Sequence, residues 1–413
     1  MQVYLESLGC RLNTAETETL SRRFAGAGHD VVSAPETADV IVLNSCAVTA
    51  QAARKSRHRL HSLHRLNPQA RLAVVGCWAT ENAARVAAFP GVTWTVPNAD
   101  KSRAVEIITG VDAPPVAWSP GRWGHTRVFL AVQDGCDHAC TYCITRVLRG
   151  PAHSRPLADA VQAAQELAAQ GAQEIVLTGV SLGAYGHDLG MAQGLATLVD
   201  TLLRETTIPR LRLSSVEPWD VDDTLLRQWE NSRLCRQLHL PLQSGSDAVL
   251  KRMGRRMSSG QFAALVDAAR AISPDIAITT DIIAGFPGET DTDFTESIDF
   301  VAQVAFARLH VFPYSTRPGT PAARLPNPIP AALRRERAAR MRALGEQLAV
   351  DYRLKFIGQI LPVLWEKRDD AGYWRGWTDN YLEVLTQSEI DLYNRITPTL
   401  LVEATEQGVV GRV

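Results

Sequence analysis

The chain has 413 residues, of which 46% are hydrophobic and 21% are charged, and its formal net charge is −1. This composition is typical of two or three globular domains and excludes a disordered, collagenous or coiled-coil protein, and no apolar run approaches the roughly 20 residues that span a membrane. Residues 1–7 lack the basic and apolar regions of a secretory signal, so we expect a cytoplasmic protein whose seven cysteines serve a purpose different from disulfide bonding.

The first third of the chain alternates short apolar runs with helical patterns, which is typical of a Rossmann-like parallel α/β sheet. The predicted strands are 3–8, 40–44 and 71–76, and the predicted helices are 15–26, 47–66 and 79–89. Cys10, Cys46 and Cys77 each follow one of these strands by one or two residues. Because open α/β sheets bind ligands at the carboxyl ends of their strands, we expect the three cysteines to lie at one edge of a domain over residues 1–115.

A positively charged segment lies within this domain. Residues 51–65 hold five Lys or Arg residues, three His residues and no acidic residue. A solvated helix face explains such a run about as well as a binding surface does, and the same holds for the basic run 251–256. The candidate nucleic-acid contacts are Arg54, Lys55, Arg57 and Arg59, which begin eight residues after Cys46.

The stretch 112–123 is rich in proline, breaks the periodicity and predicts a linker. Six apolar runs with helical patterns between them follow it. These predicted strands are 128–133, 174–180, 211–216, 237–243, 277–286 and 308–314. They indicate a partial (β/α)6 barrel over residues 122–356, ending in a charged helix at 331–356. Right-handed crossovers between parallel strands would gather the loops at the carboxyl ends around one cavity.

After residue 358 the pattern changes to short alternating strands, which predicts a small all-β barrel of the oligonucleotide-binding kind over residues 357–413. Its predicted strands are 360–366, 373–377, 381–386 and 400–405. Five basic and nine acidic residues after residue 357 are a poor balance for phosphate contacts. Aromatic faces can stack bases without much charge, and this domain holds Trp365, Tyr373, Trp374, Trp377 and Tyr381.

Cys136, Cys140 and Cys143 directly follow the first barrel strand and would lie in one loop at the barrel mouth. Thiolates suit iron–sulfur clusters, and a cubane cluster takes four of them. No fourth cysteine is nearby, since Cys235 is far along the chain and is explained more simply as a buried free thiol. One iron would therefore stay open to a ligand from outside the protein.

A zinc site completed by His138 and a redox pair of Cys140 and Cys143 are two alternatives for this loop. His138 is too close to Cys136 for the usual arrangement of two ligand pairs separated by a longer loop. A redox pair leaves Cys136 and the barrel without a role.

A CxxxCxxC loop that opens a six-stranded half-barrel resembles the radical S-adenosylmethionine (SAM) superfamily. The resemblance implies that the open iron binds the amino and carboxylate groups of SAM, and that one electron cleaves SAM to methionine and a 5′-deoxyadenosyl radical. It also implies an electron donor such as flavodoxin or ferredoxin. The candidate cofactor-binding residues, in the cysteine loop and the loops after the later strands, are Tyr142, Gly179, Ser215, Glu217, Gln243 and Gly285.

The sequences around the first three cysteines, 7–13, 44–49 and 75–77, resemble the amino-terminal domain of the methylthiotransferase family. In that family the three cysteines ligate a second [4Fe–4S] cluster. The resemblance covers essentially the whole chain and implies that the small β domain is the TRAM domain of the family. It further implies that one SAM methylates sulfur carried by the second cluster, and that a second SAM supplies the radical. One departure is Arg146, where the family usually has proline, so the loop behind the cluster could differ in shape.

The family has three branches, which act on threonylcarbamoyl-adenosine in tRNA, on isopentenyl-adenosine in tRNA, or on an aspartate of a ribosomal protein. The segments 10–16, 177–186, 213–218 and 309–315 look most like the first branch. That likeness implies action on the anticodon stem-loop of tRNA, at the adenosine in position 37. The alternative from another class is an iron–sulfur protein without radical chemistry, which needs a fourth thiolate for each cluster although the chain has one spare cysteine.

Overall fold

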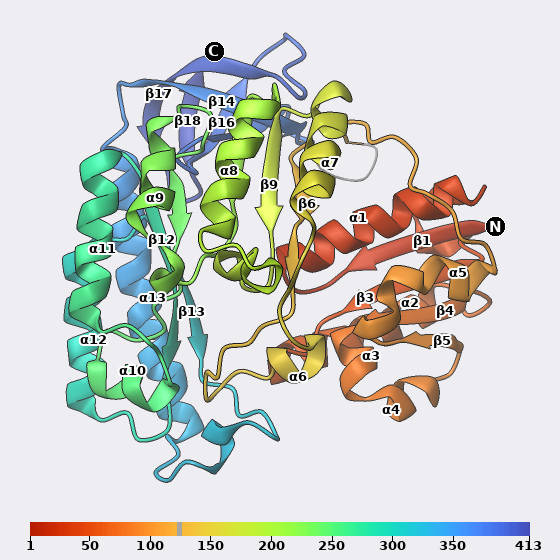
Figure 1. Ribbon diagram of the computed structural model, residues 1–413, viewed down its shortest axis with the longest axis horizontal. Helices are drawn as coiled ribbons and strands as arrows, with labels where there is room; N and C mark the ends of the chain where they lie inside the picture. Colours follow the sequence, from red (N-terminus) through yellow and green to blue (C-terminus); the bar gives the residue numbers. More distant parts are fainter. Residues whose placement is uncertain (122–125) are drawn as a thin grey trace.

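Three parts follow one another along the chain in the computed structural model, which describes residues 1–121 and 126–413 (Figure 1). Arg122 and Trp123, the last two residues of the predicted linker, lie outside the described residues. Within the described residues, no helix is both long and apolar enough to cross a bilayer.

The first part is a five-stranded parallel sheet in the order β2-β1-β3-β4-β5. Its strands are β1 (Gln2–Ser7), β2 (Asp30–Val32), β3 (Val40–Ser45), β4 (Arg71–Gly76) and β5 (Val92–Val96), and its longer helices are α1 (Arg11–Gly26), α2 (Ala50–Leu66) and α5 (Ala104–Thr109). Every residue of β3 is buried, as its continuous apolar pattern predicts for a central strand. The Rossmann-like domain is therefore confirmed.

One predicted helix of this part is wrong. The segment 79–89 forms two short helices, α3 (Cys77–Glu81) and α4 (Ala83–Ala87), instead of one. Asn82 separates them because its backbone leaves the helical region, with φ −138° and ψ 44°. The sequence also gave no sign of the short strands β2 and β5.

The second part is a partial barrel of six parallel strands. They are β6 (Val128–Ala131), β9 (Glu174–Thr178), β10 (Arg210–Leu213), β11 (Gln237–His239), β12 (Ala277–Ala284) and β13 (Arg308–Pro313). They form two three-stranded sheets, β10-β9-β6 and β11-β12-β13, which isolated bridges such as Ser215 to His239 connect. The predicted partial barrel is confirmed. A small two-stranded sheet of β7 (Gln133–Asp134) and β8 (His153–Ser154) lies beside its mouth.

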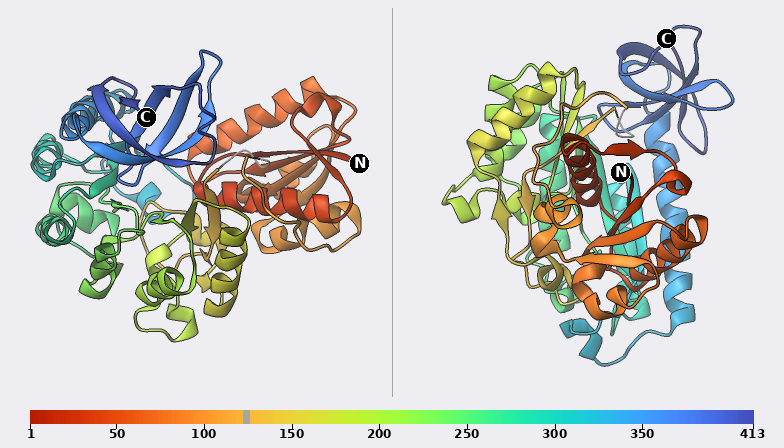
Figure 2. Two further views of the ribbon diagram at one scale, coloured as in Figure 1. Left: turned by 90° about the horizontal axis from the view of Figure 1, so that it is seen from above. Right: turned by 90° about the vertical axis from the view of Figure 1, so that its right-hand side faces the viewer.

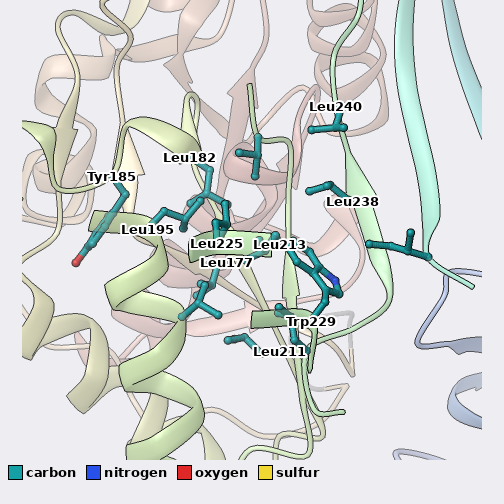
Figure 3. Close-up of a cluster of buried hydrophobic side chains, with 14 of the residues drawn as sticks. Leu177, Leu182, Tyr185, Leu195, Leu211, Leu213, Leu225, Trp229, Leu238 and Leu240 are labelled. Atoms are coloured by element: carbon teal, nitrogen blue, oxygen red, sulfur yellow. The ribbon is translucent and has the colours of Figure 1, made fainter. Parts of the chain in front are cut away.

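Helices cover the outside of the barrel wall. They are α7 (Leu157–Ala169), α8 (Gly194–Glu205), α9 (Asp223–Leu226), α10 (Asp247–Met253), α11 (Ser259–Ile272), α12 (Asp291–Val304) and α13 (Ala331–Leu354), whereas α6 (Thr145–Arg149) packs against α3 of the first part. Figure 3 shows the leucine-rich core that joins strand side chains such as Leu177 and Leu213 to Leu195 of α8. Burial of each such side chain contributes about 1.5–3 kcal/mol, so the core fixes the strand ends that carry the site loops.

The two edges of the partial barrel differ. Helix α1 of the first part packs against the edge strand β6, as Figure 1 shows. At the other edge, β13 pairs only with β12 among the described strands, while α13 packs against one of its faces. The barrel is therefore closed by the first domain on one side and open along β13 on the other.

The third part is a closed barrel in the order β14-β15-β16-β18-β17. Its strands are β14 (Ile360–Arg368), β15 (Tyr373–Thr378), β16 (Glu383–Gln387), β17 (Ile396–Ala404) and β18 (Val409–Arg412). This confirms the predicted small barrel, although β16 begins later than predicted because Tyr381 has φ 68° and belongs to the preceding turn. No predicted strand corresponded to β18.

This small barrel docks on the amino ends of the larger barrel's strands, opposite the mouth (Figures 1 and 2). Arg236 pairs with Asp379 at 2.6 Å, and Arg127 pairs with Glu366 at 2.8 Å. Arg212 donates to the backbone carbonyl of Asp379 at 3.0 Å. Part of the acidic excess of the third part therefore serves docking to arginines of the second.

Candidate functional site: two cysteine triads at a domain junction

The first cysteine triad lies in the irregular loop between β7 and α6, at the carboxyl end of the barrel. Cys136, Cys140 and Cys143 are half-buried and carry free thiols. The backbone N–H groups of His138 and Thr145 each lie 3.4 Å from a sulfur, that of Cys136 and that of Cys143 respectively. N–H groups aimed at sulfur stabilise the ionised form of a thiol and suit a loop that presents thiolates to a metal centre.

Arg255, from the turn after α10, is a functional residue that the sequence did not reveal. Its guanidinium donates to Cys140 Sγ at 3.8 Å and pairs with Glu217 at 2.7 Å. It also lies 4.3 Å from the ring centroid of Trp219. The basic run 251–256 was open to interpretation as a solvated helix face, but the Arg255 side chain is only 2% exposed. Arg255 thus places one buried positive charge beside the triad.

Burial disfavours ionisation of two thiols of the triad, Cys136 and Cys140. Burial raises the pKa of Cys136 to about 11, and the nearby Cys143, Cys140 and Glu217 act in the same direction. Burial also raises the pKa of Cys140, although Arg255 opposes this. Three adjacent thiolates are therefore favourable only together with a cationic metal centre, which is the donor set that an iron–sulfur cluster requires.

The side chains considered from the sequence as a fourth ligand, Cys235 and His138, make other contacts. Cys235 is fully buried, with its sulfur 3.8 Å from the Glu174 carboxylate. His138 forms a hydrogen bond with Ser181 at 3.0 Å. No three His, Cys, Asp or Glu side chains among the described residues converge as they would on a single ion. The thiolates of a cubane bind separate irons and stand further apart.

The residues proposed to bind the cofactor differ in their surroundings. Tyr142 is close to the triad, since Cys140 and Cys143 influence its pKa, which burial raises well above its ordinary value. Glu217 pairs with Arg255 there, whereas Ser215 bridges to β11. Gly179 packs against Gln133, whose amide donates to the carbonyls of Asp134 and Gly135 at 2.8 and 2.9 Å. These groups surround the base of the cysteine loop.

The two remaining candidates lie further along the strand ends. Gln243 is buried and adopts φ 79°, with its backbone paired to Asp281 and Ile283 of β12. Gly285 has φ +76°, and a Cβ there would lie 2.3 Å from Cγ of Arg334 on α13. The close approach of α13 by itself accounts for a glycine at that position.

The second cysteine triad lies at the carboxyl edge of the first sheet, where the sequence placed it. Cys10 precedes α1 and is exposed, whereas Cys46 follows β3, Cys77 begins α3, and both are buried. Gly9, with φ +111°, lies against Cys46 so closely that a Cβ would be 2.7 Å from the cysteine Cβ. Burial raises the pKa of Cys46 to about 11, and Cys77 and Cys10 contribute to this. The three thiols thus share one electrostatic environment.

One buried arginine connects the two triads. Arg149, at the end of α6, donates to Asn13 Oδ1 at 2.6 Å and pairs with Glu16 at 3.0 Å and Asp134 at 2.8 Å. Asn13 in turn donates to the carbonyls of Leu8 at 2.7 Å and Ser45 at 3.2 Å, next to Gly9 and Cys46. Asp134 belongs to the strand that leads into the first triad. The loops of both triads are therefore tied to the same guanidinium.

Asn98 makes a second connection. Its amide donates to Cys77 Sγ at 3.4 Å and to the carbonyl of Leu148, on α6, at 2.8 Å. Neither Arg149 nor Asn98 is part of a spacing that identifies metal ligands, so the sequence offered no signal for them.

The chain matches two family models, one described as "Uncharacterized protein family UPF0004" at residues 2–96 and the other as the radical SAM superfamily at residues 130–301. A "Threonylcarbamoyladenosine tRNA methylthiotransferase MtaB" of Bacillus subtilis is 34% identical, covering 97% of this chain and 94% of the relative. The protein of that name from Thermotoga maritima is 36% identical, covering 92% and 90%. The chain belongs to the radical SAM methylthiotransferase family.

Two further comparisons add to this assignment. A "tRNA-2-methylthio-N(6)-dimethylallyladenosine synthase" of Chloroflexus aurantiacus is 33% identical, covering 99% of this chain and 90% of the relative. The solved structure of the radical SAM methyltransferase TsrM from Kitasatospora setae has a TM-score of 0.57 at 15% identity, covering 84% of this chain and 89% of that chain, which shows a shared fold. As a radical SAM methylthiotransferase the protein is an enzyme, and its superfamily implies SAM and a [4Fe–4S] cluster.

Arg146 stands where the methylthiotransferases usually have proline. It is exposed in the first turn of α6, where backbone N–H groups have no partner within the helix. Proline and arginine are therefore both compatible with that position.

The basic segment of this methylthiotransferase lies on α2, whose side chains differ in availability. Arg54 and Lys55 are exposed and Arg57 is half-buried. Arg59 pairs with Glu6 of β1 at 2.7 Å, an acid that the segment itself does not contain. In the described part of the chain, Arg54, Lys55 and Arg57 form no salt bridge within 4.0 Å.

The aromatic residues of the small carboxyl-terminal barrel are mostly enclosed. Trp365 and Trp374 are buried in its core. Trp377 stacks on Tyr381, with ring centroids 4.9 Å apart, next to Arg127 and Arg212 of the larger barrel. Tyr373 is 38% exposed. Stacking of several bases on the outer face of this domain therefore has little support.

Proposed function

We propose that this enzyme transfers a methylthio group to C2 of N6-threonylcarbamoyladenosine at position 37 of tRNA, which yields 2-methylthio-N6-threonylcarbamoyladenosine. The observation that carries the proposal is the meeting of two cysteine triads at one domain junction, tied together by Arg149. Activation of an aromatic C–H bond and delivery of sulfur to the same carbon require two reactive centres close together. The names of the Bacillus subtilis and Thermotoga maritima relatives support the acceptor.

Two [4Fe–4S] clusters fit the donor sets of this chain. Cys136, Cys140 and Cys143 would hold one, with an iron open to SAM, and Cys10, Cys46 and Cys77 would hold the other. When bound, SAM and the two clusters would supply a carbon radical that abstracts hydrogen and a sulfur atom that is methylated and transferred.

The remaining work falls to protein side chains. Arg255 supplies a positive charge beside Cys140 and keeps Glu217 in place, while Trp219 lies under its guanidinium. Tyr142, Glu217 and Ser215 beside the first triad would orient SAM, together with Gly179, Gln243 and Gly285 at the neighbouring strand ends. Arg149 and Asn98 hold the second triad in a fixed position relative to the first. Rigid positioning and exclusion of water protect a reactive radical from side reactions.

For the remaining partners, Arg54, Lys55 and Arg57 on α2 supply phosphate contacts for the anticodon stem-loop, and Arg59 has a smaller part because of Glu6. The reductant is a low-potential carrier such as flavodoxin or ferredoxin, and the enzyme acts in the cytoplasm. An isopentenyl-type acceptor is the second candidate, favoured by the name of the Chloroflexus aurantiacus relative.

Mass spectrometry of tRNA nucleosides from cells that lack this gene tests the proposal. We expect selective loss of 2-methylthio-N6-threonylcarbamoyladenosine, with accumulation of its precursor without the methylthio group. Loss of the isopentenyl product instead would establish the second candidate, and an unchanged nucleoside profile would refute both.

A further inference from the structure

A cavity of about 980 Å³ lies where the partial barrel is open, between β13, α13 and the turns of the small carboxyl-terminal barrel. Its wall includes Arg308, His310 and Phe312 of β13, Arg353 of α13, and Tyr381 of the small carboxyl-terminal barrel. A volume of this size accommodates a modified nucleoside. No residue proposed above as a ligand of a cluster or of SAM lines it.

The strand register decides which side chains face the barrel interior. Thr279 pairs with both His239 and Arg308, and Asp281 pairs with His310, so these residues share one face of the sheet. Leu309 and Val311 belong to the other face, where they pack against the hydrophobic core, and Leu309 contacts Gly345 of α13. Arg308, His310 and Phe312 therefore line the inner wall in a row that ends near the barrel mouth.

The cavity reaches toward both triads. Arg11, directly after Cys10, donates to the hydroxyl of Tyr381 at 2.7 Å. At the end of the row, Ser315 accepts a hydrogen bond from the backbone N–H of Ala50, the first residue of α2, at 3.1 Å. A base whose C2 atom lies between the triads could therefore extend a substituent into the cavity, past the 46% exposed ring of Phe312.

Two arginines of the cavity wall lack an acidic partner within the part of the chain that the structure describes. Among the described residues, Arg308 and Arg353 have no salt-bridge partner within 4.0 Å, and Arg353 Nε is buried without a hydrogen-bond partner. Burial and the charge of Arg308 both lower the pKa of Arg353, which shows that the two guanidinium groups repel each other. Three acids also line the cavity. Glu383 pairs with Arg375, whereas Glu346 and Glu406 form no salt bridge among the described residues. Two uncompensated arginines match the oxygens of a carboxylate or a phosphate.

Further polar side chains lie on the same face of the sheet as Arg308. His239 lies 2.9 Å from Thr279 Oγ1 and 3.4 Å from the Asp281 carboxylate. The His310 ring centroid is 5.7 Å from that of His239. Burial lowers the pKa of His310 to about 4, so its imidazole is neutral at physiological pH and both donates and accepts hydrogen bonds. Such a wall fits hydroxyl and urea groups and is unsuited to a purely apolar substituent.

We propose that this cavity binds the N6 substituent of the acceptor adenosine, with its carboxylate against Arg308 and Arg353 and its urea and hydroxyl groups against His310 and Thr279. The inference rests on the proposed function and names the residues that select its substrate. An isopentenyl group would leave the arginines and the histidine without partners, and sites built from buried polar groups strongly reject analogues that cannot pair with them.

Equilibrium binding to labelled anticodon stem-loops tests this assignment with the cluster-loaded enzyme. The RNAs carry, at position 37, threonylcarbamoyl-adenosine, its neutral methyl ester, or isopentenyl-adenosine. The variants are Arg308→Gln and Arg353→Gln, and Arg335→Gln is the matched control, an exposed arginine of α13 outside the cavity. We expect the wild type to prefer the carboxylate RNA at least about tenfold over the ester, and each cavity variant to lose most of that preference.

The opposite outcomes overturn the assignment. Equal weakening of all three RNAs in the cavity variants would place the anion on the RNA backbone. A wild-type enzyme that binds acid and ester equally would refute the carboxylate contact without any variant, whether or not the variants fold. Methylthiolation of the same RNAs is followed separately by mass spectrometry, and a product from the isopentenyl RNA alone would contradict the proposed function and not merely the cavity assignment.

Discussion

The two cysteine triads differ in how the chain builds them. Cys136, Cys140 and Cys143 come from one loop, whereas Cys10, Cys46 and Cys77 come from three separate strand ends. The contiguous triad needs only its own loop and the barrel strand before it. The dispersed triad needs a folded five-stranded sheet, and its position relative to the first triad depends on Arg149. A chemically similar set of thiols can thus be encoded by spacing or by topology.

The largest effect is expected when a thiol is removed from the contiguous triad. Cys140→Ala should abolish the transfer and SAM cleavage, because both depend on the cluster that this loop binds, and bound iron should fall by about half. Iron analysis and product measurement check this. The control is Cys235→Ala, at a buried thiol remote from both triads, which should keep its iron, and equal loss in the control would count against the assignment.

Removal of a thiol from the dispersed triad should separate two activities. Cys46→Ala should still form 5′-deoxyadenosine from SAM, because the first triad is intact, but should yield no methylthio product. Chromatography of both products from one reaction measures the ratio. Continued methylthiolation by this variant would contradict a role for the second triad in sulfur delivery.

The contribution of Arg149 to the connection between the triads can be measured as a change in the free energy of unfolding. Arg149→Met removes a buried guanidinium from the half-buried carboxylates of Asp134 and Glu16 and from Asn13 Oδ1, and the loss of these charged hydrogen bonds should cost about 2 kcal/mol, since Glu16 keeps its pair with Lys101. Urea unfolding of the metal-free protein should show this loss. Arg146→Met, on the exposed side of the same helix, should change the free energy of unfolding by less than about 0.5 kcal/mol.

The smallest expected effect concerns pH and the helix that follows Cys10. Burial raises the pKa of Glu18 on α1 from 4.5 to about 7. Between these pH values the folded state keeps a proton on Glu18 that the unfolded state releases. The contribution of Glu18 to the free energy of unfolding is therefore fully present below pH 4.5 and is lost as pH rises toward 7, by at most about 3 kcal/mol. Glu18→Gln should flatten this part of the pH profile of the thermal midpoint. The exposed Glu36→Gln should leave the profile unchanged, and a steep profile in Glu18→Gln would refute the assignment.

Much of the fold was predictable because its signals are local. The six barrel strands and the small β barrel followed from apolar runs separated by turns. The break at Asn82 was missed because the apolar periodicity continues across it. Both cysteine triads were recognised because cysteines immediately after strand ends are a local pattern.

The charged partners of the site could not be predicted, because they depend on contacts between distant parts of the chain. Arg149 meets Asn13 and Glu16 across 136 and 133 residues of sequence. Arg255 meets Cys140 across 115. Arg59 differs from its basic neighbours only because Glu6, on another strand, pairs with it. Charge runs in the sequence thus did not distinguish solvated arginines from buried ones.

Electron paramagnetic resonance of the reconstituted, reduced enzyme, recorded with and without SAM, tests the account most directly. We predict two [4Fe–4S] signals, of which SAM perturbs only the one that Cys140→Ala removes. A single cluster, or two clusters that are both insensitive to SAM, would contradict the division of roles between the two triads.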